Sequence, residues 1–248
     1  MKITVLGTNG WYDTPTGNTT CVLIQTNDFN IILDAGNGMV KINGLIDYSK
    51  PCYLFLTHLH LDHTFGLHAL NLFKFQKPLK FIVPIGQEKD LFQQLRSPFM
   101  MNINDLPFSI DFIKAENLAQ TEFPFKVNCL PLVHAVPDTG YRFEIDGKII
   151  AFILDTGYCD NAVKLAENAD LAITECGALP GKATPGWPHN DPIMAAKIAS
   201  EAKARQMLLI HFSPAVYTSI EMRKNSVEMG RSTFPNLITG VDDMEIIL

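Results

Sequence analysis

The chain has 248 residues, of which 47% are hydrophobic and 19% charged, with a formal net charge of −6. This composition is typical of a globular protein, and the length fits one domain over residues 1–248. The negative charge argues against a general nucleic-acid binder, because such proteins present a basic surface to phosphates. The apolar runs are too short for a signal peptide or a membrane span. Five scattered cysteines without a C-x-x-C pair indicate reduced thiols, which predicts a cytoplasmic protein with no membrane association.

In chain order, the first half of the sequence contains short β-branched runs bounded by Gly, Thr, Asn or Pro, a pattern typical of strands. Strands are predicted at residues 2–8, 20–26, 30–36, 51–57 and 79–84. Apolar residues at helical spacing predict helices at residues 66–75 and 86–97, the second ending before Pro98. Residues 99–125 carry mixed signals and yield no predicted element.

The second half alternates strands with helices. Residues 140–157 predict a hairpin that turns at Asp146-Gly147, a pair that favours the backbone of a tight turn. The other elements are predicted at residues 125–134, 159–169, 170–177, 191–204 and 206–212, the second and fourth being helices. The helix at 191–204 has clear start signals, because Asp191 is a good N-cap residue and Pro192 fits the first helical turn.

One short pattern occurs in both halves. The sequence IILDAG at residues 31–36 and the sequence FILDTG at residues 152–157 each place an aspartate and a glycine turn after an apolar strand. This echo predicts two similar half-sheets in one domain, each covered by helices on its outer side.

The stretch LTHLHLDHTFGL, residues 56–67, contains three of the seven histidines of the chain and one aspartate within six residues. Neutral imidazoles and carboxylates are ligands for zinc, iron and manganese. Burying so many polar groups at the end of an apolar strand is costly unless something pairs them. The cluster of His58, His60, Asp62 and His63 therefore predicts a metal site, and its crowding predicts two ions.

Three more candidate ligands stand alone at the ends of predicted strands. His134 closes NCLPLVH, Asp155 closes IIAFILD and His211 closes QMLLIH. Each alone is compatible with a polar residue that ends a strand, but as a set they supply the ligands that the cluster lacks.

The order and placement of these residues resemble the metallo-β-lactamase fold superfamily, over nearly the whole chain from LGTNG to IHFSP. The resemblance implies an α/β (α+β) fold, a four-layer αββα sandwich of two mixed β-sheets with the site at one edge. It implies that a water or hydroxide between two metal ions is the nucleophile. The implied ligands are His58, His60 and His134 for the first ion, Asp62, His63 and His211 for the second, and Asp155 between them. Asp62 also has an implied catalytic role, because a ligand carboxylate can orient the attacking water.

The segments HAVPDTGYRF and WPHNDPIMAAKIASEAKARQMLLIHFSP resemble the ribonuclease Z group within that superfamily. The resemblance implies that His189 acts near the scissile phosphate as a general acid or a stabiliser of the transition state. The alternative interpretation of His189 is an exposed loop residue in a segment rich in Pro and Gly.

Two departures from the group argue against tRNA as a partner. Its helix usually starts after His-Ser or His-Thr, whereas here Asn190 and Asp191 follow the histidine. The long glycine-rich arm that grips tRNA in many members is replaced by a tight hairpin between Tyr141 and Asp155. We therefore expect a phosphodiesterase for a small anionic substrate, a cyclic or nucleotide phosphodiester, with a homodimer as the implied assembly.

Alternatives stay open at this stage. The same fold hosts hydrolases of carboxylic esters, thioesters and lactones, tRNA 3′-end processing endonucleases, and non-enzymatic or redox metal proteins. Zinc is the default metal, and the donor set also suits manganese, iron or nickel.

Further residues attract attention around the predicted site. Asp34, the counterpart of Asp155 in the first half, is expected to bond turn backbone, and His68 is expected to pack without binding metal. Thr57 and Thr156 are expected to donate to neighbouring polar groups. The loop at residues 7–20 is a candidate anion cradle or a plain rim of the site. Candidates for stacking on a base or ring are Trp11, Tyr12 and Trp187.

Overall fold

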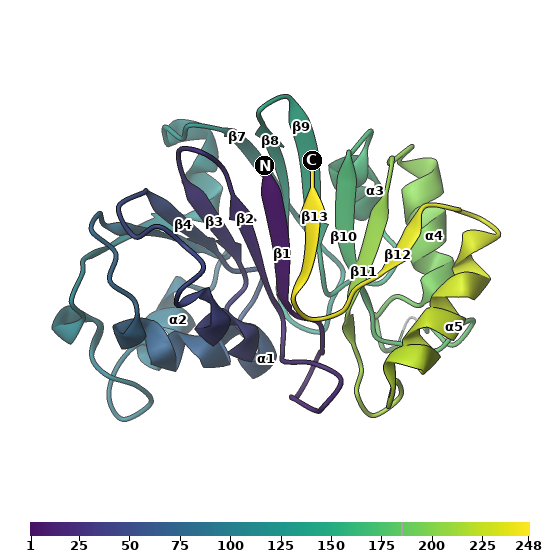
Figure 1. Cartoon of the computed structure of the whole chain (residues 1–248), viewed down its shortest axis with the longest axis horizontal. Coiled ribbons are helices and arrows are strands. Elements are labelled where there is room, and N and C mark those ends of the chain that lie inside the picture. The colour runs from purple at the N-terminus through teal and green to yellow at the C-terminus, as the bar shows by residue number, and fades with distance from the viewer. Residues whose placement is uncertain (185) are drawn as a thin grey trace.

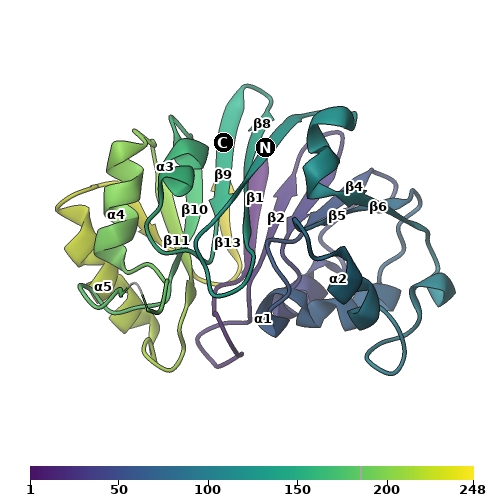
Figure 2. The same cartoon turned by 180° about the vertical axis from the view of Figure 1, so that it is seen from behind.

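The structure is a computed structural model that describes residues 1–184 and 186–248. Within them, a seven-stranded and a six-stranded sheet face each other, and helices cover the outer side of each sheet (Figures 1 and 2). In spatial order, the first sheet is β13 (Met244–Ile247), β1 (Lys2–Gly7), β2 (Cys21–Gln25), β3 (Asn30–Leu33), β4 (Cys52–Phe55), β5 (Leu79–Val83) and β6 (Ile110–Lys114). The second sheet is β12 (Leu237–Thr239), β11 (Met207–Phe212), β10 (Leu171–Cys176), β9 (Lys148–Ile153), β8 (Thr139–Ile145) and β7 (Lys126–Pro131).

The helices divide between the two outer faces. The first sheet is covered by η1 (Asn37–Ile42), α1 (Leu61–Thr64), η2 (Phe65–Leu72) and α2 (Glu88–Gln94). The second sheet is covered by α3 (Asp160–Ala166), α4 (Pro192–Glu201) and α5 (Ile220–Arg231). The short 3₁₀ turns η3 (Ile103–Asp105) and η4 (Ala115–Gln120) flank β6. The predicted four-layer αββα sandwich of two mixed sheets is confirmed.

Because side chains alternate along a strand, one strand packs residues into the core between the sheets and also under the outer helices. On β3, Ile31 and Leu33 point into the core between the sheets, whereas Ile32 packs under the helices of the first sheet. On β11, Leu208 faces the core between the sheets and Leu209 faces the helices of the second sheet. Strands that are apolar on both faces are typical of parallel pairs covered on both sides.

The direction of the strands places their ends at one edge of the sandwich. In the first sheet β3 and β4 are parallel, and in the second sheet β9, β10 and β11 are parallel. Residues that follow the carboxyl ends of these strands therefore gather where the two sheets meet, which is where open α/β sheets usually bind their ligands.

Several local predictions are confirmed. Asp146 and Gly147 both have positive φ, 50° and 75°, in the tight turn between β8 and β9. Asp191 caps α4 by accepting from the backbone N–H groups of Ile193 and Met194, each at 2.8 Å, and Pro192 is the first helical residue. All five cysteines are free.

Other parts of the fold differ from the sequence predictions. Residues 66–75 were predicted as one helix, but the structure has the 3₁₀ helix η2 up to Leu72 and an extended residue at Phe73. The strand β6 lies in the stretch 99–125 that yielded no element. Beyond Phe212, the elements α5, β12 and β13 were not predicted. The helix α5 escapes a search for apolar periodicity because its buried residues include Arg223 and Gly230.

No helix in residues 1–184 or 186–248 combines the length and the apolar character needed to span a bilayer.

Candidate metal centre and active-site pocket

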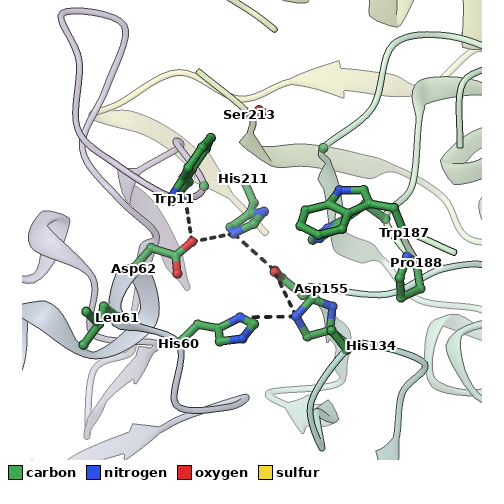
Figure 3. A pocket seen from close by; sticks show the side chains of 14 residues that line it. Trp11, His60, Leu61, Asp62, His134, Asp155, Trp187, Pro188, His211 and Ser213 are labelled. Atoms are coloured by element: carbon green, nitrogen blue, oxygen red, sulfur yellow. Dashed lines mark hydrogen bonds and ion pairs between the residues drawn. The ribbon is translucent and has the colours of Figure 1, made fainter. Parts of the chain in front are cut away.

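A cavity of about 590 Å³ opens at the edge of the sandwich where the carboxyl ends of the parallel strands of both sheets meet (Figure 3). It is lined by five of the predicted ligands, all partly or fully buried, together with loop residues from both halves. The lining residues that the argument uses are Gly10, Trp11, His60, Asp62, His134, Asp155, Trp187, His189 and His211.

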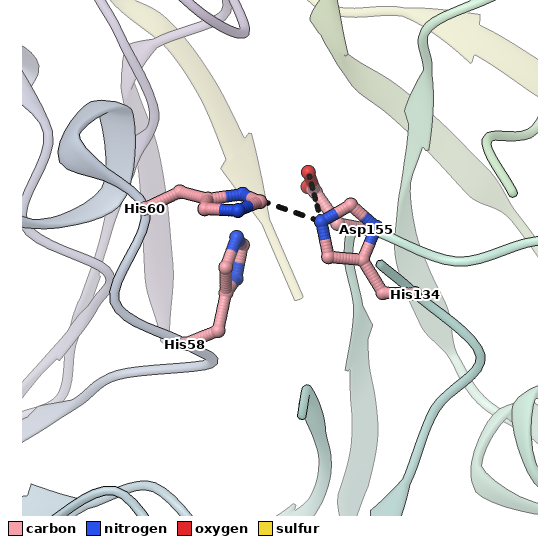
Figure 4. A group of neighbouring side chains, drawn as sticks. All are labelled: His58, His60, His134 and Asp155. Atoms are coloured by element: carbon pink, nitrogen blue, oxygen red, sulfur yellow. Dashed lines mark hydrogen bonds and ion pairs between the residues drawn. The ribbon is translucent and has the colours of Figure 1, made fainter. Parts of the chain in front are cut away.

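A first group of ligand atoms comes from both sheets. One atom from each of His58, His60, His134 and Asp155 lies within 4.8 Å of the others (Figure 4). His60 Nδ1 lies 3.3 Å from His134 Nε2, and the imidazole of His58 lies below that of His60 in the view of Figure 4. The strand β4 ends at Phe55, so the two histidines converge from the loop after it and not from the two-residue period of a continued strand. Three imidazoles and one carboxylate at this spacing can coordinate one divalent ion.

A second group lies next to the first. Ligand atoms of Asp62, His63 and His211 also lie within 4.8 Å of one another. His211 Nε2 lies 3.1 Å from Asp62 Oδ2 and 3.3 Å from Asp155 Oδ1. Asp155 therefore touches both groups, as expected for a carboxylate shared by two ions. The structure brings all seven predicted ligands together.

The protonation chemistry of the first group suits a metal ion. Burial lowers the pKa of His58 and of His134 to about 3, so their imidazoles are neutral and keep a lone pair for a cation. The buried atom His58 Nε2 has no hydrogen-bond partner among the described residues. Buried polar atoms without partners are costly, and a coordinated cation removes that cost.

The second group attracts positive charge for a different reason. Burial lowers the pKa of His63 and of His211, but the negative charges of Asp155 and Asp62 outweigh it and raise both. A proton on these imidazoles offsets the carboxylates when no metal does. Because ligand imidazoles must be neutral, metal binding here releases protons. The residues therefore fit divalent ions.

Outer contacts fix the orientation of the ligand rings. Asp34 accepts from His63 Nδ1 at 2.8 Å and from the backbone N–H of Thr57 at 2.7 Å. Asp34 thus bonds turn backbone, as expected, and it also orients the imidazole of His63. Thr57 Oγ1 lies 3.0 Å from His58 Nδ1, and Asp138 Oδ2 lies 3.1 Å from the same atom. Such contacts set the tautomer of a metal ligand and its direction.

Asp138 was not singled out by its sequence, although it follows His134 closely in HAVPDTGY. The carboxylate is fully buried, and burial raises its pKa well above the usual value.

Two of these residues have left-handed backbone conformations. Asp34 has φ = 56° and His211 has φ = 51°. L-residues adopt this region rarely because it costs free energy, and such strain concentrates at functional sites. The fold accepts this strain at two positions that orient or supply ligand atoms.

His189 lies at the cavity wall beside the ligand groups, and its partner is a glutamate that sequence reasoning missed. Glu175 on β10 is fully buried and accepts from His189 Nδ1 at 2.8 Å. The backbone N–H of Thr156 donates to the other oxygen of Glu175 at 2.7 Å. Burial lowers the pKa of His189, but the charge of Glu175 outweighs it and raises that pKa. The signal that could have identified Glu175 is an acidic residue inside the apolar strand LAITEC.

A comparison with known protein families identifies the superfamily to which the chain belongs. A family model described as "Beta-lactamase superfamily domain" matches residues 30–212. The chain belongs to the metallo-β-lactamase superfamily. The resemblance inferred from the histidine motif is confirmed, and the chain is a metallo-hydrolase of this superfamily.

Among relatives in the superfamily, the probable metallo-hydrolase YhfI of Bacillus subtilis is 25% identical over 217 residues, with 85% of this chain and 86% of YhfI covered. The crystal structure of YhfI has a TM-score of 0.81, 23% identity and coverage of 99% of this chain and 98% of that one. Ribonuclease Z of Prochlorococcus marinus (strain MIT 9312) is 26% identical over 310 residues, covering 95% of this chain and 96% of the relative. A structure described as a new diphosphatase from the PhnP family has a TM-score of 0.77 at 16% identity, covering 100% of this chain and 97% of that chain, and shares the fold.

The loop after β1 shapes the rim of this superfamily site. The N–H groups of Asn9, Gly10 and Trp11 donate to Asn18 O, Phe212 O and Asp62 Oδ2, at 2.9, 3.0 and 2.5 Å. The expectation of an anion cradle in this loop is therefore wrong for these three groups, because they are already bonded within the protein. The alternative, a rim over the site, agrees with the structure.

Two other expectations can be compared with the structure. His68 belongs to neither group of ligand atoms, and it is exposed and packs on the ring of Phe65 with the ring centroids 4.9 Å apart. Thr156 Oγ1 donates to the carbonyl of its neighbour Gly157 at 2.7 Å, as expected. It also accepts from the backbone N–H of Val133 at 3.2 Å, which links the end of β9 to the segment that carries His134.

Proposed function

We propose that this superfamily member is a phosphodiesterase that uses two divalent metal ions to hydrolyse a small phosphodiester, cyclic or nucleotide-derived. The observation that carries the proposal is the pair of His189 and Glu175 at the wall of the cavity, next to the metal-binding groups. The leaving oxygen of an alkyl phosphodiester needs a proton, and a histidine held by a buried carboxylate is suited to supply it.

The ligand assignment follows the two groups of atoms. His58, His60 and His134 would hold one ion, Asp62, His63 and His211 would hold the other, and Asp155, which lies next to both groups, would serve both. Two bound cations lower the pKa of a water molecule and offset the charge that develops at phosphorus. Zinc is the proposed ion, and manganese, iron and nickel accept the same donors.

Asp62 has a second role in this proposal. Its Oδ2 accepts from the backbone N–H of Trp11 and lies 3.1 Å from His211 Nε2. This leaves Oδ1 to accept a hydrogen bond from the attacking water and to orient it.

His189 acts on the opposite side of the reaction. Its Nδ1 is held by Glu175, so Nε2 is the atom that can donate a proton to the leaving oxygen. Because the charge of Glu175 favours the imidazolium, His189 is protonated when the substrate binds.

The cavity favours a small substrate over tRNA. None of the described lining residues is Lys or Arg, so the surface offers no basic track for a polyanion. The alignment with ribonuclease Z extends over 310 positions, more than the 248 residues of this chain, so the relative carries inserted segments. The alignment with YhfI is much more compact, at 217 positions.

The test compares bis(p-nitrophenyl) phosphate with p-nitrophenyl acetate and a simple lactone, using protein reconstituted separately with zinc and with manganese. We expect phosphodiester turnover that greatly exceeds carbonyl turnover. The variant Asp155→Ala serves as the inactive control, because its carboxylate contacts both ligand groups.

Carbonyl turnover without phosphodiester turnover would refute the proposal. It would move the protein to the ester, thioester or lactone hydrolases of the same fold, and His189 would then be a loop residue. Cleavage of a tRNA precursor in preference to every small diester would support the endonuclease alternative.

A further inference from the structure

Two exposed indoles stand at the mouth of the cavity. Trp11 and Trp187 are 70% and 65% exposed, and both line the cavity that contains the metal-binding groups. In the view of Figure 3, His211 lies between them. They are also the only two tryptophans in the sequence. Large apolar side chains at a ligand cavity usually form part of its recognition surface.

The backbone of Trp11 is held in a costly conformation. Its φ of 65° lies in the left-handed region, where a bulky side chain is rarely found. The N–H of Trp11 donates to Asp62 at 2.5 Å, and Asn9 Nδ2 donates to the carbonyl of Tyr12 at 3.1 Å. The buried guanidinium of Arg223 in turn donates to Asn9. The loop therefore fixes where the indole stands; the ring of Tyr12 contacts it edge-on, with the centroids 5.1 Å apart, and most of the indole stays exposed.

Trp187 packs against His189, the proposed proton donor. Its ring centroid lies 5.0 Å from that of His189, with the planes tilted by 40°. The N–H of Trp187 donates to Thr184 at 3.1 Å, and the N–H of His189 donates to the carbonyl of Trp187 at 2.8 Å. One indole is thus linked to the carboxylate that orients water, and the other to the histidine that faces the leaving group.

The charge of the cavity limits the chemical class of ligand that could cover these rings. With no Lys or Arg among the described lining residues, the ion-binding groups and His189 provide the contacts for negative charge. That set suits one or two phosphates and not a chain of them. The remaining wall contains Trp11, Trp187, Leu61 and Pro188, which suits a flat apolar group. The cavity volume of about 590 Å³ is that of a pocket for a small molecule.

We infer that Trp11 and Trp187 stack on the nucleobase of a nucleoside phosphodiester whose phosphate lies at the metal-binding groups. The two indoles thereby select a substrate class within the phosphodiesterase activity proposed above, and the inference rests on that proposal. Stacking of one aromatic side chain on a base changes affinity by about 5- to 150-fold.

Because both tryptophans line the cavity, the intrinsic tryptophan fluorescence of the protein reports on this site alone. Zinc-loaded protein is titrated with adenosine 5′-monophosphate and with ribose 5-phosphate, which carries the same phosphate without a base. We expect quenching by the nucleotide with a Kd at least about 5-fold lower than that of the sugar phosphate. Equal affinities, or no response to the nucleotide, would overturn the inference.

Single variants assign the effect to the two rings. Trp11→Leu and Trp187→Leu each leave one indole as reporter, and each should weaken nucleotide binding by about 5-fold or more without changing ribose 5-phosphate binding. Phe99→Leu is the matched control, since Phe99 is 64% exposed and does not line the cavity. Unchanged nucleotide affinity in both tryptophan variants would also overturn the inference.

A turnover assay separates this inference from the proposed function. Thymidine 5′-(p-nitrophenyl phosphate) and methyl p-nitrophenyl phosphate release the same phenolate and differ only in the retained group. Turnover of neither diester, together with base-dependent quenching, would refute the phosphodiesterase and leave the stacking site standing. Turnover of both with equal kcat/KM, together with equal affinities for the two monophosphates, would remove the stacking site and leave the phosphodiesterase.

Discussion

Replacing Glu175 by glutamine tests whether a buried carboxylate prepares His189 as an acid. The glutamine has nearly the same shape, and its oxygen can still accept from the N–H of Thr156, now bonded at 2.7 Å. Its amide then presents N–H to His189 Nδ1, which is 2.8 Å from the carboxylate in the native protein. At the 2.8 Å contact two donors then face each other, and the amide oxygen, 3.0 Å from Nδ1, carries no full negative charge, so the neutral imidazole is favoured over the imidazolium.

The size of the effect follows from the role of a general acid. Such a group contributes about 10²- to 10⁴-fold to rate, or about 2.7–5.5 kcal/mol at 1.36 kcal/mol per tenfold change. We expect Glu175→Gln to lose this factor in kcat with a nucleoside as leaving group. With p-nitrophenolate the loss should be small, because that anion leaves without a proton.

The pH profile gives a second readout. In the native protein Glu175 raises the pKa of His189, so activity should persist until the pH rises through that raised value. In the variant the raising effect of Glu175 is lost while burial still lowers the pKa of His189, so the alkaline limb should move to lower pH. Equal losses with both leaving groups, at unchanged zinc content, would refute the reasoning. A double variant with His189→Ala that loses no more than the single ones would support it, because the pair acts as a unit.

Three further outcomes are expected. Asp155→Ala should lose bound zinc and turnover together, which metal analysis and a rate assay can check; a variant that keeps both would contradict the ligand assignment. Asp34→Asn removes the carboxylate at 2.8 Å from His63 Nδ1 and should weaken zinc affinity by about 10- to 100-fold in a chelator competition, whereas unchanged affinity would show that the contact is dispensable. Arg223→Met removes three donated bonds to loop oxygens from a fully buried guanidinium and should lower the urea-derived free energy of unfolding by at least about 3 kcal/mol; a cost below about 1 kcal/mol would mean that the loop repacks.

The local parts of the site could be predicted because their signals are local. The residues from His58 to His63 are adjacent in sequence, and a strand that ends in His or Asp, as at Asp155 and His211, is visible without a structure. Contacts between distant strands carry no such signal. Glu175 is simply one acidic residue in an apolar strand, and only the fold shows that it faces His189.

The same distinction applies to the framework of the fold. The two half-sheets were suggested by the echo of IILDAG and FILDTG, and the αββα layers were implied by the family resemblance. The helix α5 was missed because it buries Arg223, a residue that normally indicates an exposed face. The single domain over residues 1–248, the homodimer and the cytoplasmic location stay predictions.

The pairing of β1 with β13 has a consequence for synthesis. Lys2 is in register with Ile247, and Met1 N lies 3.3 Å from Leu248 O, so the two ends lie together at the same place in Figure 1. A ribosome makes β1 first and β13 last, so until then one side of β1 has unpaired N–H and C=O groups, a template for unwanted association with other chains. The ligands His58 to His63 are therefore made long before the strand that pairs with the free side of β1.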